Sequence, residues 1–91
     1  MDEVLRASLT VGSALHALRM DRGGSALVAV LDQAGAAVRD LGTGPYARAL
    51  HTVLDEIQDC NATGRRTSPG LEAAIEAALT ALDLQTTDRR G

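Results

Sequence analysis

The chain has 91 residues, of which 45% are hydrophobic, and this size and composition fit one small folded domain and exclude a disordered chain. The net charge of −3 and the single aromatic residue, Tyr46, exclude the basic, aromatic-rich surfaces that bind nucleic acids, so we expect no nucleic-acid partner. The one cysteine, Cys60, excludes an internal disulfide.

Residues 2–20 carry apolar side chains at a 4-3-4 spacing, which is typical of a helix with one buried face. The positions with this spacing, including one lapse at a serine, are Val4, Ser8, Val11, Leu15 and Leu18. Gly12 lies inside the segment and predicts a close crossing of two helices, because a glycine there otherwise lowers helix stability. Gly23 and Gly24 follow and are expected to end the helix.

Residues 25–41 form the second predicted helix, with Ser25 as its N-cap. Its apolar positions repeat the same spacing at Leu27, Leu31, Ala34, Val38 and Leu41. Gly42 and Gly44 then break the helical pattern.

Two further helices are predicted over residues 45–62 and 69–84. Pro45 suits the first position of one, and Ser68 followed by Pro69 suits the start of the other. Their apolar positions are Tyr46, Leu50, Val53, Ile57 and Cys60 in the first, and Leu71, Ile75, Ala78 and Leu82 in the second. Gly64 is expected to end the third helix.

Four apolar faces joined by short links predict an all-α fold, a small antiparallel four-helix bundle. The bundle is expected to occupy residues 1–85 as a single domain. Residues 86–91 contain no apolar side chain and are predicted to form a flexible C-terminal tail.

Several apolar residues fall outside the four seams and predict contact with another protein. The segment 26–31 is apolar on every side, so its residues either fill the core of one chain or meet a partner chain. We predict a non-catalytic interaction module that binds another protein or a second copy of itself, as a homodimer or a hetero-complex. Adaptors, secretion chaperones, antitoxin-like inhibitors and assembly subunits belong to this class. The predicted interface residues are Leu9, Val28, Val30 and Leu54.

A second hypothesis concerns the stretch from Ala14 to Arg19, which contains His16, Leu18 and Arg19. It resembles the histidine phosphotransfer domains, in which a histidine on a four-helix bundle is followed by any residue, a leucine and a lysine or arginine. The resemblance implies that His16 receives a phosphoryl group whose oxygens Arg19 helps to hold. Met20 departs from the family pattern, because a small residue normally follows. The other interpretation of His16 is a histidine on the surface of a helix or at an interface.

No other motif predicts chemistry. His51 and Asp55 could supply two metal ligands at i and i+4, but a third is missing from the pattern, so we expect no metal and interpret them as a side-chain pair. Asp55, Glu56 and Asp59 fall off the apolar seam and predict a solvated acidic face. No phosphate-binding glycine loop or nucleophile motif is present, so we expect no cofactor and no catalytic residue.

The sequence also predicts a cytoplasmic location. Asp2 and Glu3 are the opposite of the positive start of a signal peptide, and the longest uncharged run, residues 23–31, is too short to span a membrane. All nine basic residues are arginine, which is typical of a bacterium with a GC-rich genome.

Overall fold

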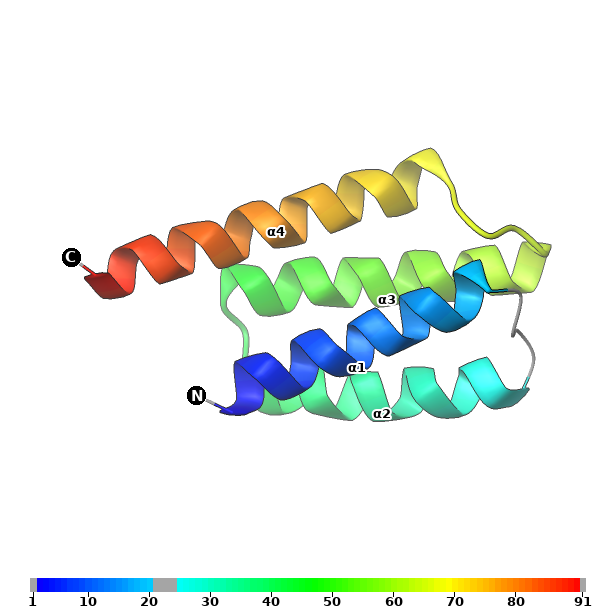
Figure 1. Ribbon diagram of the computed structural model, residues 1–91, viewed down its shortest axis with the longest axis horizontal. Helices are drawn as coiled ribbons and strands as arrows, with labels where there is room; N and C mark the ends of the chain where they lie inside the picture. Colours follow the sequence, from blue (N-terminus) through cyan, green and yellow to red (C-terminus); the bar gives the residue numbers. More distant parts are fainter. Residues whose placement is uncertain (1, 21–24, 91) are drawn as a thin grey trace.

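The four predicted helices are present in the computed structural model, which describes residues 2–20 and 25–90 (Figure 1). The helices are α1 (Asp2–Arg19), α2 (Ser25–Leu41), α3 (Pro45–Thr63) and α4 (Pro69–Arg90). Successive helices run in opposite directions, so α1 is parallel to α3 and antiparallel to α4 (Figure 1). The predicted all-α antiparallel four-helix bundle is confirmed.

The helices pack as two sequential pairs, α1 with α2 and α3 with α4, and α3 joins the pairs. The backbone of α3 lies close to all three other helices, whereas that of α4 lies close to α3 alone in the described residues. Among the described residues, no Cα atom of α4 lies within 8 Å of a Cα atom of α1 or α2. The bundle is therefore open on the side where α1 and α4 face each other.

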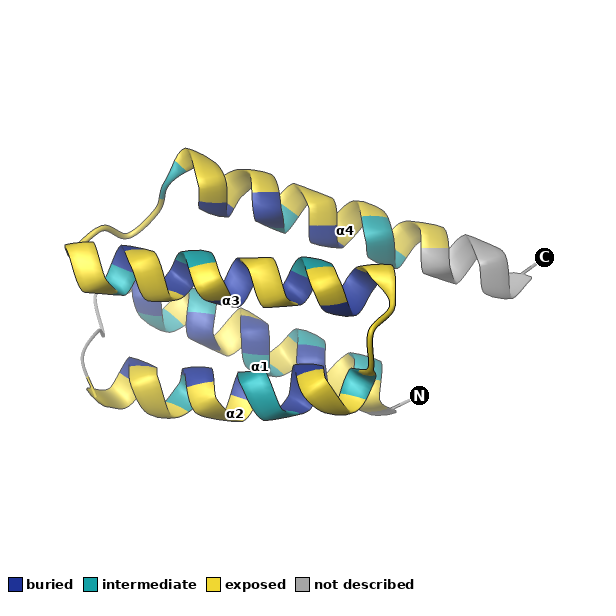
Figure 2. Cartoon of the chain, turned by 180° about the vertical axis from the view of Figure 1, so that it is seen from behind, coloured by how far each residue is buried: buried dark blue, intermediate teal, exposed yellow. Residues whose placement is uncertain are grey.

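The central position of α3 explains why it buries a wide apolar arc. Seven of its residues are buried, and they are Tyr46, Ala47, Leu50, Val53, Leu54, Ile57 and Cys60. A helix with three neighbours must bury a wider arc than a helix with one. Figure 2 shows the contrast with α4, where buried positions are fewer and follow one edge of the helix.

The core consists mainly of aliphatic side chains and alanines, with Tyr46 as its one aromatic residue among the described positions, as the near absence of aromatic residues predicts. The largest side chains that are fully buried are Leu27, Ile57, Leu71, Val38 and Cys60. Cys60 is a free, buried thiol that packs as a small apolar side chain. Among the described residues, no polar or charged residue is buried.

The helix ends use the residues that the sequence assigned to them. Gly42 and Gly64 adopt positive φ angles of 103° and 72°, which only glycine adopts without strain. After Gly64 the backbone N–H of Arg65 donates to the Cys60 carbonyl oxygen at 2.8 Å, which closes the last turn of α3. The Ser68 side-chain oxygen accepts from the Leu71 N–H at 3.0 Å, so Ser68 caps α4 as predicted.

The structure corrects two expectations about the helices. Helix α4 continues to Arg90 rather than ending near Leu84, because no glycine or proline interrupts the backbone before Gly91. Gly12 does not mark a helix crossing inside the chain, since a Cβ atom at this position would meet nothing within 4 Å. The predicted glycine stop at Gly23 and Gly24 lies outside the described residues.

Candidate interaction surface

Six large apolar side chains are exposed in the described part of the chain. They are Leu5, Leu9, Met20, Val28, Leu79 and Leu84. Scattered apolar residues are ordinary on protein surfaces, so their grouping matters more than their number. Four of the six lie on α1 and α4, two helices with no Cα atoms within 8 Å of each other in the described residues.

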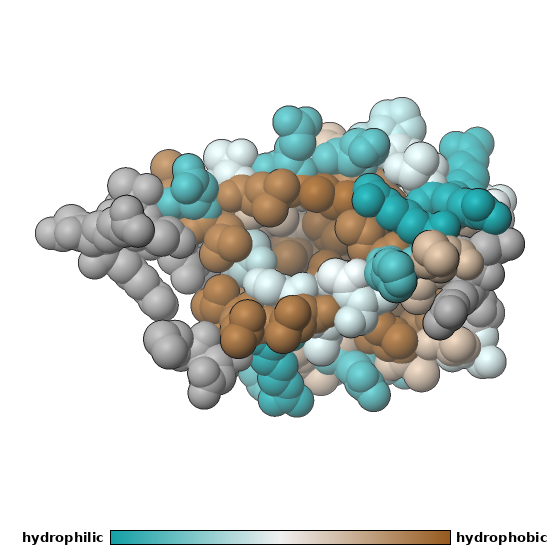
Figure 3. Space-filling view, in the orientation of Figure 1, coloured by the Kyte–Doolittle hydropathy of each residue, from teal (hydrophilic) through white to brown (hydrophobic). Residues whose placement is uncertain are grey.

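Apolar side chains line both walls of a hollow between α1 and α4. Figure 3 shows them in brown along each helix, with further apolar atoms deeper between the walls. We call this surface the α1–α4 face and define it by Leu5 and Leu9 on α1 and by Ile75, Leu79 and Leu82 on α4. Exposed leucines on two separate helices thus form one candidate interaction surface.

The α1 wall is an outward ridge. Leu5 and Leu9 are one helical turn apart and are 59% and 61% exposed, while the buried Ala7 and Val11 occupy the opposite side of the helix. No described helix covers the ridge. Gly12, on the same side as Leu5 and Leu9, is also exposed, so a neighbouring backbone can approach closely there.

The α4 wall combines half-buried and exposed residues on one side of the helix. Ile75 and Leu82 pack partly against the core, whereas Leu79 between them is 61% exposed. Glu72 and Glu76 precede Leu79 at helical spacing and are both exposed. The outer edge of this wall is therefore acidic toward the start of α4.

The predicted interface residues occupy different environments. Leu9 lies on the α1–α4 face, and Val28 is 50% exposed on α2. Val30 is half-buried and packs against the core. Leu54 is instead 6% exposed within the core, because α3 has neighbours on three sides, so its side chain is not on the surface. We leave Leu54 out of the candidate surface.

Leu5 and Leu79 belong to the surface but were not among the predicted interface residues. The available signal was spacing: Leu5 lies four residues before Leu9, and Leu79 lies between Ile75 and Leu82 at helical intervals. The spacing places these residues on one side of each helix. It does not show that the two sides face each other, because that depends on how the helices pack.

His16 and Arg19 both lie on the exposed side of α1, near its C-terminal end. Met20, which replaces the small residue of the phosphotransfer pattern, follows them and is 56% exposed. His16 continues the ridge of Leu5, Leu9 and Gly12 by one further turn. The two basic residues thus lie at the end of the apolar ridge.

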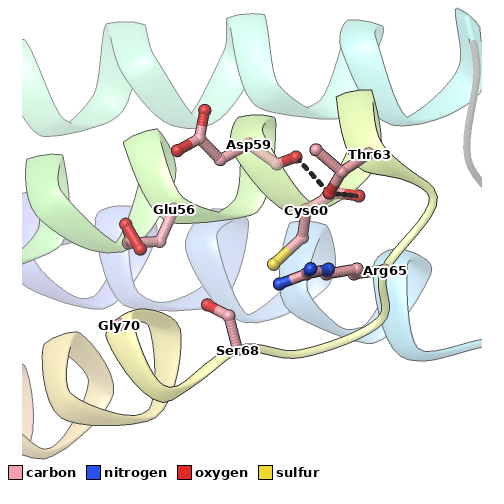
Figure 4. Close-up of a pocket in the computed structure, with 7 residues that line it drawn as sticks. All are labelled: Glu56, Asp59, Cys60, Thr63, Arg65, Ser68 and Gly70. Atoms are coloured by element: carbon pink, nitrogen blue, oxygen red, sulfur yellow. Dashed lines mark hydrogen bonds between the residues drawn. The ribbon is translucent and has the colours of Figure 1, made fainter.

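A separate, polar hollow of about 340 Å³ lies where α3 ends and α4 begins (Figure 4). Its lining consists of Glu56, Asp59, Cys60, Thr63, Arg65, Ser68 and Gly70. The polar groups here have structural roles. The Thr63 hydroxyl donates to the Asp59 carbonyl oxygen at 2.9 Å, and the Ser68 hydroxyl caps α4.

The same hollow shows how closely α3 and α4 pack. The Glu56 carboxylate lies against Gly70, where a Cβ atom would collide with it. In Figure 4 the Cys60 sulfur points toward the hollow, which Arg65 also lines. The thiol belongs to a residue that is only 1% exposed, so the hollow offers a partner little access to it.

The described residues contain no group of three histidine, cysteine, aspartate or glutamate side chains that could hold a metal ion. His51 and Asp55 are both exposed on α3. None of the described helices is both long and apolar enough to span a membrane.

The chain matches no protein-family model, no curated protein and no solved structure. No relative therefore supports a specific function, and the arrangement of the chain's own residues carries the functional argument.

Proposed function

We propose that the chain is a non-catalytic interaction module and that the α1–α4 face is where it binds another protein surface. The observation that carries this proposal is that exposed leucines, Leu5 and Leu9 on α1 and Leu79 on α4, lie on two helices with no Cα atoms within 8 Å of each other. A helix with a free apolar side is a common recognition element, because a partner helix can lie along it.

The energetics favour covering this face. Leu5, Leu9 and Leu79 are each about 60% exposed. Since fully burying a leucine contributes about 1.5–3 kcal/mol, covering the exposed part of each contributes about 1–2 kcal/mol. Three such residues in one patch, next to the half-buried Ile75 and Leu82, match the apolar centre of an ordinary interface.

The proposal covers adaptors, secretion chaperones, inhibitors and assembly subunits alike, because each of these acts by burying a helix face. The acidic edge at Glu72 and Glu76 adds a condition on the partner. A partner with arginine, lysine or histidine beside its own apolar residues complements this edge, whereas an acidic partner is repelled.

Site-specific photo-crosslinking in cells that make the protein tests the proposal. A photoreactive amino acid is placed at Leu9 or Leu79 on the α1–α4 face, at Val28 on α2, or at the exposed polar Gln58 on α3. We expect a discrete adduct, with this chain or with another protein, from Leu9 and Leu79 but not from Gln58.

The Val28 position decides which apolar surface is used. Adducts from Val28 alone would move the interface to α2 and overturn the assignment to the α1–α4 face. A lack of adducts from all three apolar positions, in protein that circular dichroism shows to be folded, would overturn the interaction module itself.

A further inference from the structure

We propose that the occupant of the α1–α4 face is a second copy of this chain, with α1 of each copy lying in the hollow between α1 and α4 of the other. This inference rests on the proposed function and specifies its partner. Three observations carry it: the levels of the residues along the two helices, the distribution of charge, and the shape of the face.

The first observation is that the outward residues of α1 and α4 lie at matching heights. Ser8 and Tyr46 share a hydrogen bond of 2.6 Å between their side chains, so these two residues are neighbours on α1 and α3. The contact of Glu56 with Gly70 does the same for α3 and α4. Because α1 runs parallel to α3 and α4 runs antiparallel, counting from these contacts puts Leu9 within about one helical turn of the height of Leu79, and His16 within about one turn of Glu72.

The match continues along both helices. The outward positions of α1 follow one another at intervals of four, three and four residues, and they are Leu5, Leu9, Gly12 and His16. The outward positions of α4 follow the same intervals in reverse order, and they are Asp83, Leu79, Glu76 and Glu72. Two helices with this shared spacing pack along their length at a shallow angle.

The second observation is charge. The basic residues of the ridge, His16 and Arg19, are at the C-terminal end of α1, and the acidic residues Glu72 and Glu76 are at the N-terminal end of α4. A two-fold axis parallel to the helices keeps every residue at its own height. It therefore brings Arg19 and His16 of one copy beside Glu72 of the other, and leucine beside leucine near the middle.

The alternative two-fold axis, perpendicular to the helices, is disfavoured by the same charges. It places α4 against α4 in opposite directions, so that acidic positions on one copy face acidic positions on the other. Like charges in an interface oppose association.

The third observation is shape. Each copy has a protruding ridge, with Leu5 and Leu9 pointing outward, and beside it a hollow with apolar walls (Figure 3). A ridge and a hollow on the same surface are self-complementary under a two-fold rotation. Gly12 lies midway along the ridge and carries no side chain to hold the two α1 helices apart.

Sedimentation velocity over the micromolar range measures the association of the wild-type chain. We expect a dimer that Leu9→Asp and Leu79→Asp each weaken at least tenfold, with unchanged helix content because both side chains are exposed. Val28→Asp is the matched control, since it puts the same charge on an exposed apolar position of α2, which α4 does not contact. Its dissociation constant is expected to stay at the wild-type value.

Cysteine crosslinking tests the geometry. Leu79→Cys alone is expected to form no linked dimer on oxidation, whereas its mixture with Leu9→Cys forms one. Cys60 can remain in both variants because it is buried. A linked dimer from Leu79→Cys alone would show α4 against α4 and overturn the proposed axis.

A charge exchange tests the register. Arg19→Glu is expected to weaken the dimer severalfold, and adding Glu72→Arg in the same chain is expected to restore it. Failure of the double variant to recover, while its monomer remains folded, would contradict the pairing.

The oligomeric state separates this inference from the proposed function. A wild-type chain that stays monomeric at the highest concentration overturns the dimer, as does a dimer that Val28→Asp disrupts and Leu9→Asp does not. If the monomer still gives photo-adducts with a different protein at Leu9 and Leu79, the interaction module stands and only its partner changes.

Discussion

The hydrogen bond between Ser8 and Tyr46 gives a quantitative test of how α1 is held on α3. The Ser8 hydroxyl donates to the Val4 carbonyl oxygen at 2.7 Å, and it has only one hydrogen. Tyr46 must therefore be the donor in the 2.6 Å contact between the two hydroxyl oxygens. Tyr46 is 5% exposed, so water cannot easily replace Ser8 as its acceptor.

The two ends of this bond predict unequal losses. Tyr46→Phe removes the donor and leaves Ser8 bonded to Val4, so we expect a loss of about 1 kcal/mol in unfolding free energy, the net value of one hydrogen bond. Ser8→Ala leaves the Tyr46 hydroxyl without its acceptor, which costs about 1–3 kcal/mol. The better helix propensity of alanine offsets up to about 0.7 kcal/mol of that cost.

A double-mutant cycle followed by urea denaturation and circular dichroism measures the interaction. The variants are Ser8→Ala, Tyr46→Phe and both together, and the double variant is expected to lose about 1 kcal/mol less than the sum of the single losses. Additive losses would show that the two hydroxyls do not bond. They would also remove one of the two contacts that set the height of α1 against α4.

Three further predictions concern the helix ends, one helix interior and the candidate histidine. Gly64→Ala is expected to lower the unfolding free energy by about 1–2 kcal/mol, because alanine is strained at a positive φ. Gly35→Ala, in the interior of α2 where a Cβ atom meets nothing, is expected to raise it by about 0.5–1 kcal/mol. Equal effects of the two variants in urea denaturation would contradict the role of Gly64 as a helix end. Ser68→Ala is expected to lower the unfolding free energy by about 1 kcal/mol, because it removes the cap of α4. Ser68→Asp keeps a hydrogen-bond acceptor and is expected to retain most of that stability. An equal loss of unfolding free energy in both variants would refute the capping role. Incubation with phosphorylated receiver domains is expected to leave the chain unphosphorylated, and transfer that His16→Gln abolishes would instead establish the phosphotransfer hypothesis.

The helices could be predicted from the sequence because two local signals agree. The 4-3-4 spacing gives each helix its buried face, and the residues at the ends give its bounds, as with Gly42, Pro45 and Ser68. The end of α4 was the exception. The apolar pattern predicts that the helix ends at Leu84, its last apolar residue, but polar residues continue a helical backbone until something interrupts it.

The lapse at Ser8 shows what spacing cannot provide. A serine in an apolar seam and a lone tyrosine are both visible in the sequence, separated by 38 positions. Each looks like an isolated irregularity. Their partnership depends on α1 lying beside the start of α3, and no local pattern contains that information.

The candidate surface depends on packing in the same way, and the contrast between Leu9 and Leu54 shows why. Both leucines fall outside the 4-3-4 seam of their helix, but Leu54 lies directly beside that seam, whereas Leu9 lies on the side of α1 opposite the buried Ala7 and Val11. Helix α3 is surrounded by three helices, and the apolar arc it must bury is wide enough to include Leu54. The side of α1 that carries Leu9 has no neighbour, so the same kind of residue is left 61% exposed. The place of a surplus leucine relative to the seam, together with the number of neighbouring helices, thus decides whether it joins the core or stays free to bind a partner.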